Sequence, residues 1–248
     1  MNNAFRQTLL SLIAPALLSL ALLPATGQAA SVSGSGKLAT ETRTVPEFQA
    51  IGLSGSMDLV VRQGEVQSVQ VQADDNLLPL LETVVESGQG GPALKVRWKK
   101  GQSLYTRSKI LVTVVVPKLT ALSAAGSGDM LVEAFNTPVF KLAISGSGDV
   151  KLVGMNTADL GIQISGSGDV AGSGSAAKLK INIAGSGDVR MAEMKSDDVS
   201  VAIAGSGDAA VQAQKSLQVS IAGSGDVTYT GNPTVKSSVA GSGSVSKR

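Results

Sequence analysis

The decapeptide AISGSGDVKL, residues 143–152, contains the motif that organises this chain. The tetrapeptide Gly-Ser-Gly-Asp occurs six times, and a near-copy, Gly-Ser-Gly-Ser, ends the series. Successive copies lie 20, 20, 19, 20, 18 and 18 residues apart. A repeat of this length is typical of a solenoid, in which each repeat forms one coil and packs on its neighbours. The copies begin at Gly126, Gly146, Gly166, Gly185, Gly205, Gly223 and Gly241.

Apolar and polar residues alternate between the motifs. Leu160, Ile162 and Ile164 precede one copy, and Val201 and Ile203 precede another. A period of two indicates strands. A coil of about 20 residues at about 3.3 Å each has a contour of about 66 Å, which is enough for two or three short strands and their corners. The sequence therefore predicts an all-β fold, a right-handed parallel β-helix or solenoid with 18–20 residues per coil, since β-crossover-β connections are right-handed.

The motif itself keeps the alternation. Counting in twos from Ile144 places Gly146 and Gly148 on the inner side of the coil, and Ser147 and Asp149 on the outer side. The inner glycines are expected either to let the backbone approach the opposite wall or to form a corner with positive φ. A phosphate-binding loop is not expected, because a strand rather than a helix follows each motif.

The motif aspartates are expected to stack as an outward ladder with a spacing of about 4.8 Å. Two carboxylates at that distance repel by roughly 1 kcal/mol in water, so cations such as Lys151 and Arg190 and the backbone amides of the same motif should offset the repulsion. Calcium is the alternative, but a tight calcium site gathers about six to eight oxygen ligands. Each coil supplies only one carboxylate, so neither a metal site nor a cofactor is predicted. The candidates for metal binding are Asp129, Asp149, Asp169, Asp188, Asp208 and Asp226.

A second candidate surface lies in LKVRWKKGQSLYTRSK, residues 94–109. The alternation predicts a hairpin with one basic face and with Trp98 and Tyr105 nearby. Such a face could bind an anionic glycan or a lipid headgroup. The alternative is a solvated edge strand that lysines protect from aggregation. The basic residues are Lys95, Arg97, Lys99, Arg107 and Lys109.

Residues 1–29 are expected to be a signal peptide. Arg6 precedes an apolar run, residues 9–23, and small residues at Gly27 and Ala29 fit a cleavage site. The run is interrupted and shorter than the roughly 20 residues that a membrane helix needs. The protein is therefore predicted to be exported, to the periplasm or to the cell surface.

The rest of the chain divides by regularity. Residues 30–122 are expected to form an irregular β-rich part, and residues 123–248 a regular solenoid. The near-copy Gly55-Ser56-Met57-Asp58 suggests that the first part is a divergent section of the same coil series.

The composition excludes several chemistries. The chain has no histidine and no cysteine, which excludes imidazole relays, thiol nucleophiles, disulfides and thiolate metal sites. A formal net charge of +2 gives no electrostatic case for nucleic acid. Paired carboxylates could still hydrolyse glycosides, but a catalytic pair needs two different environments, whereas the motif aspartates recur equivalently. No enzymatic activity is predicted.

The order of several stretches carries a family resemblance. FQAIGLSGSMDLVVRQG (48–64), LKVRW (94–98), LVTVVVPKLTALSAAGSGD (111–129) and the serial ISGSGDV blocks together resemble a bacterial family called "putative auto-transporter adhesin, head GIN domain". The resemblance implies an exported, solenoid-like protein of uncharacterised molecular function, with adhesion suggested by the name. It implies no catalytic or binding residues.

Three functional classes follow from these observations. The favoured one is a surface or periplasmic binding module, because an array of equivalent Ser and Asp positions suits a repetitive partner such as a cell-envelope polysaccharide, or else a surface protein. Structural self-assembly by end-to-end stacking of coils is second. A polysaccharide-degrading enzyme is third.

Overall fold

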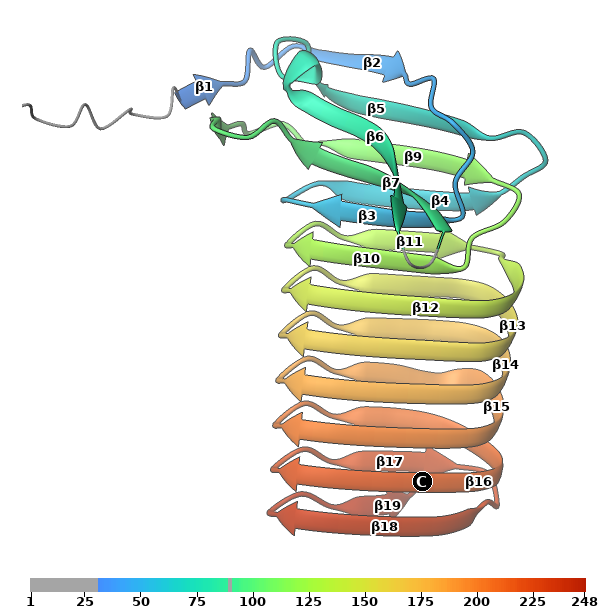
Figure 1. Cartoon of the computed structure of the whole chain (residues 1–248). Coiled ribbons are helices and arrows are strands. Elements are labelled where there is room, and N and C mark those ends of the chain that lie inside the picture. Colours follow the sequence, from blue (N-terminus) through green and yellow to red (C-terminus); the bar gives the residue numbers. More distant parts are fainter. Residues whose placement is uncertain (1–30, 89–90) are drawn as a thin grey trace, which may run out of the picture.

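The structure, a computed structural model, describes residues 31–88 and 91–248, so the predicted signal peptide lies outside the described residues. The described chain is an elongated stack of β-strands (Figure 1), and it confirms the predicted β-solenoid. Its single helical turn in these ranges is the short 3₁₀ segment η1 (Leu78–Leu80). No helix within these ranges is long and apolar enough to cross a membrane.

Five long strands form the regular part of the stack, and each pairs in parallel with the next. Gly146 lies beside Gly166, and Gly166 lies beside Gly185, so equivalent motif positions stack in register. The five strands are β12 (Asn136–Gly146), β13 (Val150–Gly166), β14 (Val170–Gly185), β15 (Val189–Gly205) and β16 (Ala209–Gly223). Strands β13 to β16 each begin after one motif, bend around the core and end at the next motif, whereas β12 begins after the short strand β11 (Met130–Glu133).

The burial pattern of β13 shows how one coil turns. Val153 and Gly154 are consecutive exposed residues, and so are Ala158 and Asp159, which breaks the alternation at two places. These breaks are corners, and the motif is a third. Differences in coil length are absorbed by register shifts at the first two corners, for example between Leu152 and Met155 and between Ser196 and Asp198. The buried inner residues of this coil are Val150, Leu152, Met155, Thr157, Leu160, Ile162 and Ile164.

The motif forms a turn that only glycine can make. Gly146 has φ +140°, and a Cβ atom there would lie 2.2 Å from the carbonyl oxygen of Gly126 in the preceding coil. A Cβ on Gly148 would meet the carbonyl oxygen of Gly128 at 2.2 Å. The predicted corner with positive φ is therefore confirmed. The predicted approach to the opposite wall is wrong, because the close contact is with the coil next in the stack.

The first part of the chain supplies two further coils. Strands β3 (Ala50–Ser54) and β4 (Asp58–Gln63) pair in parallel with β10 (Ala121–Gly126) and β11 (Met130–Glu133). On their other side they pair with β7 (Gly91–Trp98) and β9 (Leu111–Val116).

Residues 50–63 thus lie between coils built from segments that follow them in sequence. The near-copy at Gly55 occupies the place of a motif, and the expected division at residue 122 falls inside β10.

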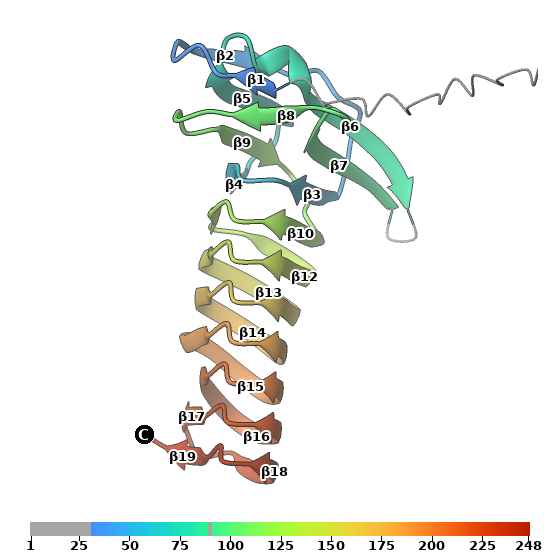
Figure 2. The same cartoon turned by 90° about the vertical axis from the view of Figure 1, so that its left-hand side faces the viewer.

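Antiparallel strands close this end of the stack (Figure 2). Strand β6 (Leu81–Gly88) covers β7, β5 (Ser68–Asp74) covers β9, and β2 (Leu38–Thr42) covers β5. A separate two-stranded sheet joins β1 (Ser31–Ser33) to β8 (Ser103–Tyr105). One hydrophobic core nevertheless runs through both parts, from Phe48 to Val227.

The other end of the stack is open. Its last strands are β17 (Val227–Thr230), β18 (Thr234–Gly241) and β19 (Val245–Lys247). Every residue of β18 is exposed, and among the described strands it pairs only with β16. The two ends of the solenoid are therefore built differently.

Candidate functional site: a groove along the aspartate ladder

The motif aspartates form a hydrogen-bonded ladder along the stack. Oδ1 of Asp149 accepts the backbone N–H of Asp169, one coil further on, at 3.0 Å. The same bond recurs at every step from Asp58 to Ser244, with distances of 2.8–3.3 Å. The carboxylates lie on the exposed side of the coil, as predicted. We call the series Asp58, Asp129, Asp149, Asp169, Asp188, Asp208 and Asp226 the aspartate ladder.

The ladder replaces strand pairing where the chain turns. The carbonyl oxygen of Asp149 accepts the N–H of Met130 from the preceding coil at 2.7 Å, so ordinary pairing resumes at this residue. Its own N–H has a side-chain acceptor instead, Oδ1 of Asp129. An unpaired backbone N–H is costly, and a charged acceptor makes a strong hydrogen bond. A carboxylate at this position therefore secures the turn of the next coil.

Cations and amides offset the repulsion between neighbouring carboxylates. Arg190 lies 3.1 Å from Oδ2 of Asp169 and 3.1 Å from Oδ2 of Asp188. Lys109 lies 2.6 Å from Oδ2 of Asp58, and this hydrogen bond together with the charge of Asp58 raises the pKa of Lys109. The expected amides come from the following coil rather than from the motif itself. Lys151 forms no ion pair with any residue that the structure describes.

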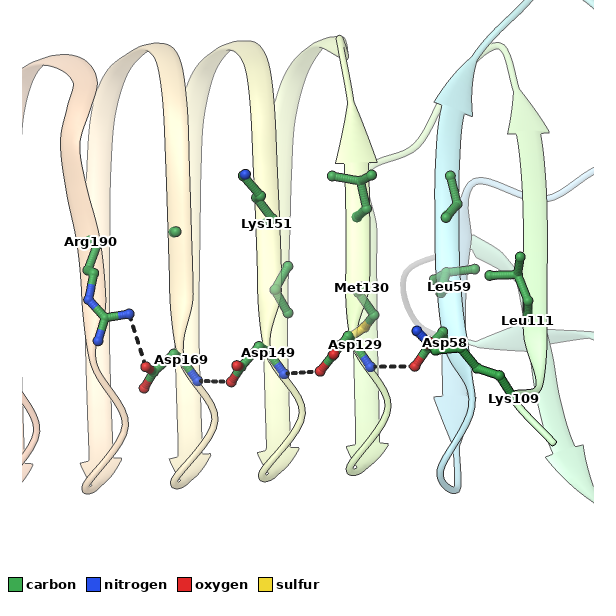
Figure 3. A pocket seen from close by; sticks show the side chains of 14 residues that line it. Asp58, Leu59, Lys109, Leu111, Asp129, Met130, Asp149, Lys151, Asp169 and Arg190 are labelled. Atoms are coloured by element: carbon green, nitrogen blue, oxygen red, sulfur yellow. Dashed lines mark hydrogen bonds and ion pairs between the residues drawn. The ribbon is translucent and has the colours of Figure 1, made fainter. Parts of the chain in front are cut away.

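A groove follows the ladder on the outside of the solenoid (Figure 3). Its main section has a volume of about 450 Å³. Asp129 and Asp149 lie side by side along it (Figure 3), and Leu131, Lys151 and Ala171 also line it. Two adjoining hollows of about 310 and 350 Å³ share Arg190 with this section. We call these three sections together the ladder groove.

The ladder groove presents hydrogen-bonding groups that the fold does not use. Within residues 31–88 and 91–248, Oδ2 of Asp129 and Oδ2 of Asp149 have no hydrogen-bond or ion-pair partner. These oxygens can accept hydrogen bonds from a ligand, and the Lys151 ammonium can donate them. The apolar side chains of Val60 and Leu131 lie beside them. The groove therefore combines regularly spaced acceptors, a donor and apolar surface.

The predicted basic hairpin is not formed. Strand β7 pairs with β3 and β6, whereas β8 pairs with β1, so residues 94–98 and 103–105 lie in different sheets. Both edges of β7 are already occupied, which leaves no edge for a return strand.

The five basic residues also have separate surroundings. Arg97 contacts Glu86 at 2.7 Å and Glu82 at 3.2 Å, and these glutamates raise its pKa. Lys109 belongs to the ladder, and Lys95 lies over Gly52. Lys99 and Arg107 are exposed.

Residues 31–88 and 91–248 contain no cluster of three or more carboxylates placed to hold a metal ion. The ladder presents its carboxylates singly, one per coil, and uses Oδ1 of each for the next backbone N–H.

Sequence reasoning missed one buried charge. Asp74 is fully buried, and its carboxylate accepts hydrogen bonds from Thr106, from Ser108 at 2.7 Å and from the Gly36 N–H at 3.1 Å. The first two bonds lower the pKa of Asp74 most strongly. The sequence shows only two adjacent acids, Asp74 and Asp75. It does not show their hydrogen-bond partners, which lie in loops far away in the sequence. Asp74 thus holds together the closed end of the solenoid, away from the ladder groove.

These features define an exposed-groove β-solenoid, elongated along one axis and closed at one end. The chain belongs to the family described as "Putative auto-transporter adhesin, head GIN domain", whose profile matches residues 47–233. No curated protein is detectably similar to it.

Solved structures share the fold over most of the chain. A "putative adhesin" from Bacteroides fragilis has a TM-score of 0.81 at 24% identity, with 88% of this chain and 100% of that chain covered. A "Putative lipid binding protein" from Parabacteroides distasonis has a TM-score of 0.73 at 26% identity, with the same coverage. A "putative adhesin" from Parabacteroides merdae has a TM-score of 0.70 at 22% identity, with 88% and 99% covered.

Proposed function

We propose that the protein is an exported, non-enzymatic binding module of the cell envelope, in the periplasm or at the cell surface, and that its ladder groove binds a polysaccharide. The observation that carries this proposal is the repetition of acceptors along the groove. Asp129 and Asp149 each offer one unused carboxylate oxygen, and successive coils of a parallel sheet lie about 4.8 Å apart. A polymer with repeated hydroxyl groups can engage several coils at once.

The lining of the groove suits a sugar chain. Sugar hydroxyls donate to carboxylate oxygens, and the less polar faces of sugar rings can lie against Val60, Leu131 and Ala171. Each contact is exposed and therefore weak. Linked contacts along one polymer gain from a high effective concentration, so a repeated weak site becomes a useful binding surface.

A binding role fits the aspartates better than catalysis does. Glycoside hydrolysis requires an acid and a base with different environments. In the ladder, Oδ1 of Asp129, Asp149 and Asp208 each accepts the N–H of the next ladder residue, and Oδ2 of each has no partner in the part of the chain that the structure describes. Two of the similar solved structures carry adhesin names, and none of the three carries an enzyme name.

Self-assembly by stacking of coils is less well supported. A further parallel coil would place a backbone N–H over residue 244, where the ladder has serine instead of aspartate. The Ser244 hydroxyl already donates to Oδ1 of Asp226 at 2.8 Å. The last position of the ladder is thus not built like the positions that receive another coil.

Glycan-array binding tests the proposal, using the protein expressed from its full sequence. Ala171→Trp would fill the groove, and Ala177→Trp, at an exposed corner of the same strand, is the matched control. We expect the wild type and Ala177→Trp to bind a common set of polysaccharides that Ala171→Trp loses. Phospholipid vesicles form a second arm, prompted by the lipid-binding name of one similar structure. Vesicle binding without glycan binding would contradict the proposal.

A further inference from the structure

One coil of the solenoid is cut back on the outside, next to the ladder groove. Outward positions of β13 and β15 carry Lys151 and Arg190, whereas the position between them in β14 carries Ala171. The next residues of β14, Gly172 and Ser173, are small as well. The result is a hollow of about 310 Å³ that shares Lys151, Ala171 and Arg190 with the main section of the groove. We call this hollow the notch.

Two cations flank the notch from opposite sides. Lys151 pairs with Ala171 in the sheet register, and Ala171 pairs with Arg190, so the cations are two coils apart. Two coil steps separate their backbones by about 10 Å. Both side chains are long enough to reach a group placed over Ala171, and alanine leaves that space open.

The charges of the notch leave capacity for an anion. Arg190 contacts Asp169 and Asp188, but its side chain is 60% exposed. Lys151 has no carboxylate partner among the described residues. Ser173 accepts the Gly154 N–H at 3.3 Å, so its hydroxyl proton remains free to donate. Glu193 is the carboxylate among the residues that line the notch, so this lining carries two positive charges and one negative charge.

We infer that the notch is an anion subsite of the ladder groove, and that the polysaccharide bound there carries acidic substituents such as carboxylate or sulfate groups. This inference rests on the proposed function and narrows it. Lys151 and Ser173 bind the acidic group, Arg190 contributes from the far side, and the ladder carboxylates bind neighbouring hydroxyls. The notch then sets the specificity, because a neutral chain leaves Lys151 unpaired.

The test compares matched pairs of polymers on the protein expressed from its full sequence. Polygalacturonic acid is compared with its methyl ester, and dextran sulfate with dextran, by isothermal titration calorimetry. Lys151→Gln removes the unpaired cation without breaking an ion pair. Lys180→Gln, an exposed lysine in the opposite part of β14, is the control. We expect an acidic polymer to bind more tightly than its neutral counterpart, with the difference falling about three- to tenfold in Lys151→Gln.

The outcomes separate this inference from the proposed function. Equal binding of acidic and neutral polymers, both lost in Ala171→Trp, would overturn the anion subsite and leave polysaccharide binding in place. An equal loss in Lys151→Gln and Lys180→Gln would also overturn it, since that result indicates attraction by net charge alone. If no polymer binds to the wild type, both proposals fail.

Discussion

Oδ1 of Asp149 accepts the backbone N–H of Asp169 at 3.0 Å, across the gap between two coils. This relationship explains why the motif ends in aspartate. The preceding glycines turn the chain so sharply that its strand pairing is interrupted, and the carboxylate supplies the missing acceptor. The other carboxylate oxygen remains on the outside, where it lines the ladder groove.

The acceptor role predicts different effects for two substitutions at Asp149. Asp149→Asn keeps an oxygen at the Oδ1 position, so the free energy of unfolding should change by less than about 0.5 kcal/mol. Asp149→Ala leaves the N–H of Asp169 without its partner and should cost about 1 kcal/mol. Urea denaturation measures both. Equal stability of the two variants would show that the hydrogen bond does not contribute.

The motif turn predicts a severe effect at Gly166. This residue has φ +135°, and a Cβ there would lie 2.3 Å from the carbonyl oxygen of Gly146. Gly166→Val should therefore destabilise the protein by about 3 kcal/mol or more, and the loss should spread because coils stabilise their neighbours. Gly161→Ala in the same strand is the control, since its Cβ would meet only Lys141 Cγ at 4.0 Å. Thermal melting distinguishes them, and similar melting temperatures would contradict the close-packed turn.

The single carboxylate per coil predicts that folding does not depend on calcium. The melting temperature should be the same in excess chelator and in millimolar calcium. Binding at a hundredfold excess over the dissociation constant would add about 2.7 kcal/mol, which is readily detected. A variant with Asp169 and Asp188 changed to Asn is the comparison. A calcium-dependent rise that this variant lacks would show that the ladder binds calcium.

Asp74 predicts a loss of stability in acid. Hydrogen bonds from Thr106 and Ser108 lower its pKa in the folded state below the usual value of 3.8. A lowered pKa in the folded state stabilises the protein above the unfolded value, and this contribution disappears as the pH falls toward the folded value.

Asp74→Asn should therefore be less stable than the wild type at pH 7, and its stability should depend less on pH below about pH 4. Asp159→Asn, at an exposed corner, is the control. Urea unfolding at several pH values checks this. A wild-type pH profile in Asp74→Asn would contradict the assigned role.

The regular coils were predictable because their information is local. The spacing of the motifs gave the coil length, and the alternation around Ile144 gave the inner and outer faces. The near-copy at Gly55 even placed residues 50–63 in the coil series. Its position in the stack was not predictable, since the pairing of Asp58 with Asp129 spans 71 residues.

The parts that sequence reasoning missed depend on distant pairings. The predicted basic hairpin was wrong because β3 and β6 occupy both edges of β7, so residues 99–109 cannot pair with β7. The partners of Asp74 come from loops far away in sequence. The ladder groove required knowing which outward residues of successive coils stand side by side, which the register of β13, β14 and β15 supplies.

The central claim, that the ladder groove binds polysaccharide through the ladder carboxylates, is tested most directly by carboxylate footprinting. The protein is labelled with a water-soluble carbodiimide and an amine, with and without a polysaccharide selected from the array, and labelled residues are located by mass spectrometry. We predict that the polysaccharide protects Asp129 and Asp149 and leaves Asp159, an exposed corner residue outside the groove, unchanged. Unchanged labelling of Asp129 and Asp149 at saturating polysaccharide would contradict the claim.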